Sequence, residues 1–161
     1  MKNGILEQFA CHYSPTDFEK IRFDWNGEYG DKFFDKNYQF RMQLAEFLLP
    51  RLRSVKLDLI RDLYLEMGKS SEATFGVYFN FHRFAQELLE RGGVHFLTSY
   101  IKGASHTMDT ALASGRITLS RERAVELLNF FDEKRKLSTD PNELLLFNDY
   151  FRSRLEYYAS K

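Results

Sequence analysis

The sequence predicts an all-α fold, a compact single-domain bundle of about seven to eight helices covering residues 1–161. Three observations support this prediction. Apolar residues recur every three or four positions over most of the chain, which is the period of a helix with one buried face. Helix start and stop residues bound these segments. Short linkers join them, and the sequence contains no convincing pair of strands.

The first long element begins at Ser14-Pro15, because Ser14 can cap a helix and Pro15 needs no hydrogen-bond donor at the first helical position. Asn26-Gly27 then serves as the stop. A strand is the alternative for residues 18–25, since apolar side chains also alternate there before Asn26-Gly27, a strong hairpin signal. The cap favours the helix. Its apolar face would hold Phe18, Ile21 and Trp25.

Two antiparallel helices are expected next. The first runs from about residue 31 to 49 and ends before Pro50, which cannot continue a helix. The second begins near Pro50 or Ser54 and stops at Gly68, a residue suited to a left-handed cap. The apolar stripe of the first comprises Phe34, Tyr38, Met42, Ala45 and Leu48; that of the second comprises Leu57, Ile60, Leu63, Tyr64 and Met67.

A central aromatic-rich helix is predicted near 71–90, opened by Ser70-Ser71 and ended by Gly92-Gly93. Phe75 and Phe79 extend its apolar cover to a second side, and a helix that is apolar on more than one side is expected in the middle of a bundle. The main stripe comprises Val77, Phe81, Phe84, Ala85 and Leu88.

Four further helices follow. Two short ones cover 94–102 and 105–114, and Gly103 and Gly115 stop them. Ser120 caps the next, and Asp140-Pro141 begins the last, with an arrangement like a capping box. The last stripe comprises Leu144, Phe147, Phe151, Leu155 and Tyr158.

Composition excludes several classes of partner and compartment. The 23 basic residues balance the 23 acidic ones, so no overall field attracts nucleic acid or an anionic membrane. The single cysteine, Cys11, cannot form an internal disulfide, and no apolar run is long enough for a signal peptide or a membrane span. We therefore expect a cytoplasmic protein that does not bind membranes.

The sequence lacks the common motifs for metals, cofactors and nucleophilic catalysis. No histidine has a glutamate three residues before it, and the sequence has no His-Glu-x-x-His, phosphate-binding loop, Gly-x-Ser-x-Gly or paired Cys-x-x-Cys. We expect neither a metal site nor a cofactor. The sequence favours a binding protein over an enzyme.

An inter-helix pocket is the alternative to a protein-binding surface. His82 lies in mid-helix, and His106 and Asp109 share a helical face, where a carboxylate can orient an imidazole. With Tyr64 and Tyr78 these residues could line a ligand or enzyme site. The structural interpretation, a hydrogen-bonded boundary histidine and a surface pair, is favoured for both histidines.

A second alternative is DNA binding by a helix-turn-helix at 105–125. Ala111 and Gly115 have about the expected separation for that motif. Ser114, Arg116 and Arg121 stand where the motif normally has apolar residues, so nucleic-acid binding is unfavoured.

The best candidate interface is the segment 23–36, which mixes aromatic side chains, acids and two glycines and breaks the helical period. Aromatic anchors with steering acids are typical of protein interfaces. The competing interpretation is a loop that its aromatics pin to the bundle. We expect a protein-binding module that neutralises or tethers a partner with a basic surface, in the manner of an immunity protein or antitoxin. Its contact residues would be Asp24, Trp25, Glu28, Tyr29 and Asp31.

Overall fold

The computed structural model describes residues 2–161 and confirms the all-α prediction for that range. The only strand-like pairing there is an isolated antiparallel bridge between Trp25 and Asp35. The α-helices are α1 (Lys2–His12), α2 (Tyr38–Leu48), α3 (Leu57–Thr74), α4 (Phe81–Glu90), α5 (Val94–Ala104), α6 (Met108–Ser114), α7 (Arg121–Leu137), α8 (Pro141–Leu146) and α9 (Asp149–Ala159). Three short 3-10 helices join them: η1 (Pro15–Lys20), η2 (Gly30–Lys32) and η3 (Leu49–Ser54).

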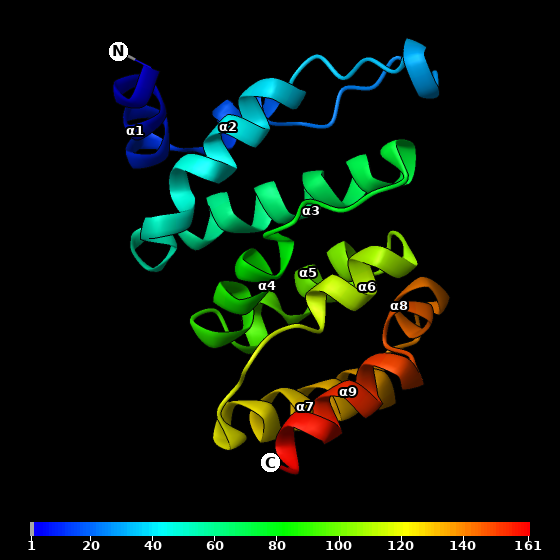
Figure 1. Cartoon of the computed structure of the whole chain (residues 1–161). Coiled ribbons are helices and arrows are strands. Elements are labelled where there is room, and N and C mark those ends of the chain that lie inside the picture. Colours follow the sequence, from blue (N-terminus) through cyan, green and yellow to red (C-terminus); the bar gives the residue numbers. More distant parts are fainter. Residues whose placement is uncertain (1) are drawn as a thin grey trace.

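The helices follow the chain order from one end of the molecule to the other (Figure 1). α3 crosses the middle, with α1 and α2 on one side of it and α4, α5 and α6 on the other. α7 and α9 pack against each other at the far end. Within residues 2–161, no helix is long and apolar enough to cross a membrane.

Both interpretations of residues 18–25 are partly wrong. The helix begins at Pro15 as predicted, but the Ser14 hydroxyl acts there as a donor: the Asp17 carboxylate accepts hydrogen bonds from the Ser14 backbone N–H (3.2 Å) and hydroxyl (3.0 Å). The helix is a 3-10 helix that ends at Lys20, however, and the chain then extends toward the bridge at Trp25. Asn26-Gly27 belongs to a hairpin, as the alternative predicted, although its strands are too short to form a sheet.

The helix predicted for 31–49 begins later, at Tyr38. Asn26 N–H donates to the Phe34 carbonyl at 2.9 Å and Lys36 N–H donates to the Asp24 carbonyl at 3.0 Å, so residues 34–36 are paired in the hairpin. Phe34 is therefore 61% exposed rather than part of the buried stripe. The end before Pro50 is confirmed.

The predicted stop at Gly68 is wrong, because α3 continues to Thr74. Gly68 lies where α3 meets the end of α5: a Cβ atom there would be 2.8 Å from His106 Cδ2 and 3.0 Å from the Gly103 carbonyl oxygen. The glycine is required for close helix packing rather than for a cap.

The helix predicted near 71–90 is two helices. Ser70 and Ser71 are buried in α3, and α4 begins only at Phe81. The main stripe from Phe81 onward is fully buried as expected. The second apolar side was misinterpreted: Phe75 and Phe79 lie in the connecting loop and are 78% and 81% exposed.

The C-terminal start signals are confirmed. Ser120 Oγ accepts the Arg123 N–H at 3.2 Å, and the Asp140 carboxylate accepts the Asn142 N–H at 2.9 Å. The helix that Asp140 begins ends at Leu146, and Asn148 then caps α9 by accepting the Tyr150 N–H at 3.1 Å. The predicted last helix is thus broken once.

Candidate functional site

The segment 23–36 forms a hairpin, which we call the aromatic hairpin. It projects beyond the start of α2 and lies over the C-terminal end of α3 (Figure 1). Asn26 fixes its shape from inside: the side-chain amide donates to the Lys32 carbonyl at 2.8 Å, and the amide oxygen accepts the N–H groups of Glu28 and Phe34. Gly27 and Gly30 take positive φ angles of 80° and 66° at the turns, where a side chain would be strained.

A buried ion pair anchors the base of the hairpin. Arg41 of α2 and Asp35 are both fully buried, and their side chains pair directly. The second carboxylate oxygen of Asp35 accepts the N–H groups of Asp24 and Asn37, each at 3.1 Å. Asp35 therefore connects both strands of the hairpin to α2. Breaking such a pair leaves an uncompensated buried charge, which makes it a strong determinant of local structure.

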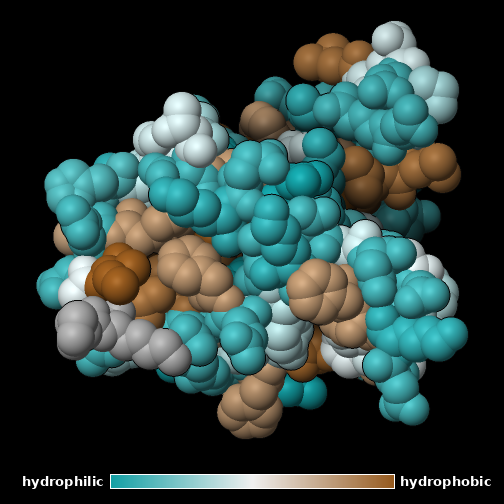
Figure 2. All heavy atoms as spheres, turned by 90° about the horizontal axis from the view of Figure 1, so that it is seen from above, coloured by the Kyte–Doolittle hydropathy of each residue, from teal (hydrophilic) through white to brown (hydrophobic). Residues whose placement is uncertain are grey.

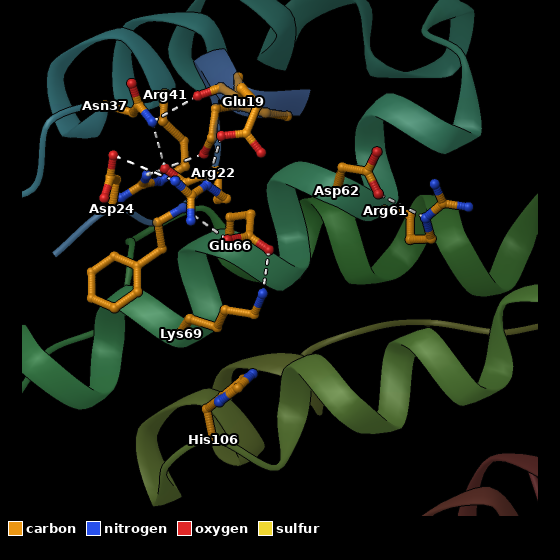
Figure 3. A network of polar contacts seen from close by, with 12 residues as sticks. Glu19, Arg22, Asp24, Asn37, Arg41, Arg61, Asp62, Glu66, Lys69 and His106 are labelled. Atoms are coloured by element: carbon orange, nitrogen blue, oxygen red, sulfur yellow. Dashed lines mark hydrogen bonds and ion pairs between the residues drawn. The ribbon is translucent and has the colours of Figure 1, made fainter. Parts of the chain in front are cut away.

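Glu66 and Asn37 complete this anchor, and Figure 3 shows their side chains directed toward the base of the hairpin. Glu66 of α3, 2% exposed, accepts the Phe23 N–H at 2.8 Å and pairs with Lys69 at 2.6 Å. The Asn37 amide donates to the Glu19 and Arg22 carbonyls at 2.9 and 2.8 Å. The hairpin is thus fixed to α2 and α3 by polar contacts that satisfy its backbone.

The aromatic rings of the hairpin form a continuous row. Phe23 stacks on Trp25 with ring centroids 6.1 Å apart, and Trp25 meets Tyr29 edge-on at 5.0 Å. Trp25 Nε1 also donates to the Glu28 carbonyl at 2.8 Å. Tyr29 in turn lies 5.6 Å from Phe75, so the row passes from the hairpin to the end of α3. We call Trp25, Tyr29 and Phe75 the aromatic row.

Much of this row faces solvent. Tyr29 is 57% exposed and Phe75 78% exposed, whereas Trp25 is partly buried. The face of the molecule seen in Figure 2 is mostly hydrophilic, with hydrophobic side chains reaching the surface at several places. Exposed aromatic surface of this kind is characteristic of interaction sites.

Phe75 has an unusual backbone. Its φ of 56° and ψ of 30° place it in the left-handed region, and it is the only non-glycine residue with a positive φ in the described chain. A non-glycine residue in that region costs on the order of 1–3 kcal/mol. Gly76 follows directly, so the position that glycine would occupy most easily carries an exposed phenylalanine instead. The sequence did not indicate this role for Phe75, whose signal was a large apolar side chain beside a glycine at the edge of the predicted stripe.

The predicted acids divide into two groups. Asp24 lies 3.6 Å from Arg22 and is partly covered. Glu28 and Asp31 are exposed at the tip, and neither makes an ion pair with any described residue. The structure thus brings the five predicted contact residues together on one projecting element, and adds Phe75 to them.

The residues of the predicted inter-helix pocket are dispersed. Tyr64 is fully buried, and its hydroxyl bonds to the Tyr100 carbonyl at 2.9 Å and to Ser114 Oγ at 2.8 Å. Burial, and then the neighbouring Tyr100, raise the pKa of Tyr64 well above its usual value. Tyr64 is therefore a satisfied core tyrosine.

The other pocket candidates lie apart from Tyr64. Tyr78 donates to Glu46 at 2.5 Å beside a cavity of 290 Å³ between α2 and α3. Burial, followed by the charges of Arg83 and Arg116, lowers the pKa of His82, whose buried Nδ1 has no hydrogen-bond partner among the described residues. His106 pairs with Glu72 at 2.6 Å rather than with Asp109, which is exposed.

The region proposed for a helix-turn-helix has other packing partners. α6 packs chiefly against α4 and α5, whereas α7 packs chiefly against α9. In residues 2–161 no group of three or more His, Cys, Asp or Glu side chains could hold a metal ion.

Comparisons with known proteins identify no relative: no family model, no curated protein and no solved structure matches this chain. The function must therefore be argued from the site itself.

Proposed function

We propose that this chain is a protein-binding module that neutralises or tethers a partner protein, and that the aromatic hairpin and Phe75 form its contact surface. One observation carries the proposal: Tyr29 and Phe75 are in ring contact although more than half of each is exposed. They come from two separately anchored elements. Large contiguous apolar patches are uncommon on the surfaces of monomeric proteins and often mark binding sites.

The anchoring of the hairpin supports a binding role. A flexible loop loses conformational entropy when it binds, at a cost of about 0.5–1.5 kcal/mol for each immobilised side chain. Here Asp35, Arg41 and Glu66 already hold the hairpin, and Trp25 is fixed by its bond to the Glu28 carbonyl. The rings are therefore presented in advance, as expected of hot-spot residues.

The charges suggest the chemistry of the partner. Glu28 and Asp31 stand beside the aromatic row, free of ion pairs with described residues. Exposed acids accelerate the approach of a basic surface. An arginine or lysine of the partner could also lie over the faces of Tyr29 and Phe75, since aromatic rings attract cations. We therefore propose a partner with a basic contact surface.

Site-specific photo-crosslinking tests the proposal. The photoreactive amino acid p-benzoylphenylalanine would replace Tyr29 or Phe75 in the cells that make the protein. Leu137, at the end of α7 and 76% exposed, is the matched control. We expect one discrete adduct from positions 29 and 75 and none from position 137.

Equal adducts from all three positions, or none from positions 29 and 75, would contradict the proposed surface. If a discrete adduct forms, the activity of the identified partner with and without this chain separates neutralisation from tethering.

A further inference from the structure

A second surface feature lies far from the hairpin, in a groove of about 640 Å³ between the end of α6 and α9. Leu112, Gly115 and Arg116 line one side, and Tyr150, Arg154 and Tyr157 line the other. Figure 1 places α6 and α9 on the opposite side of α3 from the hairpin.

The groove carries positive charge without a matching anion. Arg154 is partly buried, and its guanidinium contacts only uncharged oxygens: the Ala111 carbonyl at 2.8 Å, the Tyr100 hydroxyl at 3.3 Å and the Tyr150 hydroxyl. Arg116 forms no ion pair with a described residue. A partly desolvated guanidinium without a carboxylate attracts an anion strongly, because little water screens it.

The one acidic side chain that lines the groove, Asp149, already forms an ion pair. Asp149 pairs with Arg135 at 2.7 Å, so its charge is compensated from outside the groove. Gly115 leaves room for the opposing cation: a Cβ atom there would be 2.8 Å from Arg154 Cζ, so a larger residue would displace the end of the arginine side chain. The glycine thus allows the guanidinium to lie against the backbone at the floor of the groove.

Aromatic faces accompany the charge. Tyr150 and Tyr157 are 46% and 55% exposed. The Arg154 guanidinium lies 4.7 Å from the Tyr150 ring centroid and Lys161 Nζ lies 4.1 Å from the Tyr157 ring centroid, so a cation of the chain covers one face of each ring. An exposed tyrosine beside an arginine can stack on a flat ring while the guanidinium binds an attached phosphate or carboxylate in a bidentate manner.

We propose that this groove binds a small ligand in which a phosphate or carboxylate is attached to a flat aromatic ring. Arg154 and Arg116 hold the anionic group, and Tyr150 and Tyr157 stack on the ring. This site is independent of the proposed protein interface, because it shares no residue with the aromatic hairpin or Phe75.

Calorimetric titration of the full chain tests the site with two probes. Adenosine 5′-monophosphate represents the phosphate source and 2-naphthoate the carboxylate source. The controls for adenosine 5′-monophosphate are adenosine, which lacks the phosphate, and inorganic phosphate, which lacks the ring. The control for 2-naphthoate is naphthalene-2-carboxamide, which lacks the negative charge. We expect at least one anionic probe to bind at least about tenfold more tightly than its partial counterparts, and increasing salt to weaken that binding.

Variants locate the binding. Arg116→Gln and Tyr157→Ala change exposed side chains, so they should fold normally, and each should weaken the better probe about tenfold. Arg51→Gln removes an exposed arginine at the other end of the molecule and should change nothing. The proposal is overturned if millimolar amounts of both probes bind no better than their partial counterparts. It is equally overturned if Arg116→Gln and Tyr157→Ala, with unchanged thermal melts, bind like the parent chain.

Discussion

The same residue types do opposite things in two parts of this molecule. Around α3, α4 and α5, Tyr64 stacks on Phe81 at 4.4 Å and lies parallel to Tyr100 at 6.4 Å, and all three are almost completely buried. At the hairpin, Tyr29 and Phe75 also contact each other yet remain mostly exposed. The core rings are covered on all sides, whereas the hairpin rings are covered on one.

The supports of the two regions differ in kind as well. Apolar packing surrounds the core rings, and one hydroxyl network satisfies Tyr64. The hairpin, which has little apolar core of its own, depends on buried polar groups instead: Asp35, Arg41 and Glu66. Aromatic content alone therefore does not distinguish a core from a binding surface. The two regions are distinguished by the contacts that hold each ring in place.

The largest expected effect comes from removing the anchor of the hairpin. Arg41→Met leaves Asp35 buried without a partner, so the free energy of unfolding should fall by about 3–5 kcal/mol. Urea denaturation followed by circular dichroism measures this. Arg22→Gln removes solvent-exposed pairs with Glu19 and Asp24 and should cost less than about 1 kcal/mol.

The double variant Asp35→Asn plus Arg41→Met sharpens the first prediction. Because it removes both charges, it should recover part of the lost stability. A loss below about 1 kcal/mol for Arg41→Met alone would mean that apolar packing, not this pair, fixes the hairpin.

The second prediction concerns binding through the hairpin. Tyr29→Ala should cost about 2 kcal/mol or more of affinity for the captured partner, since it removes an aromatic anchor. Asp24→Asn plus Asp31→Asn should mainly slow association and flatten its salt dependence. Surface plasmon resonance at two salt concentrations separates these effects. Normal thermal melts with undiminished binding in both variants would place the interface elsewhere.

Close packing of the core provides the third prediction. A Cβ atom on Gly103 would be 2.1 Å from the Tyr64 ring, so Gly103→Ala should cost about 1–3 kcal/mol of stability by overpacking. Gly4 in α1 has nothing within 4 Å of the same atom, and Gly4→Ala should be neutral or slightly stabilising. Thermal melts compare the two. Equal effects would show that the α3–α5 contact can relax.

The sequence predicted the fold class and most helix starts because caps such as Ser120 and Asp140 act locally. One kind of error comes from contacts between segments that are distant in the sequence. Gly68 indicates a helix end when only neighbouring residues are considered, but it meets α5, which lies about 35 residues further along the chain. Local patterns cannot reveal such a contact.

The candidate site, like the fold, could be predicted from the sequence only in part. Residues 23–36 were recognisable by their mixture of acids and aromatics, whereas the link to Phe75 depends on how α3 ends beside the hairpin. Helical spacing made Phe75 and Phe79 resemble core residues. Asp35 resembled the other acids of the segment, although its burial gives it a structural role.

The smallest expected effect distinguishes most directly between a structural and a functional role for Phe75. Phe75→Gly removes a side chain from a left-handed position, so it should stabilise the fold by up to about 1 kcal/mol while weakening partner binding. Phe75→Ala keeps the unfavourable backbone and loses the ring, so it should weaken binding without the gain. Phe79→Gly is the control, because Phe79 is equally exposed but has no positive φ, and it should not stabilise the fold.

If Phe75→Gly raises the free energy of unfolding and lowers the affinity for the partner, the phenylalanine at this position lowers the stability of the fold in order to present its ring. If Phe75→Gly destabilises the fold instead, the contact with Tyr29 serves to hold the hairpin, and the exposed row is the outer edge of the core rather than a surface built for a partner.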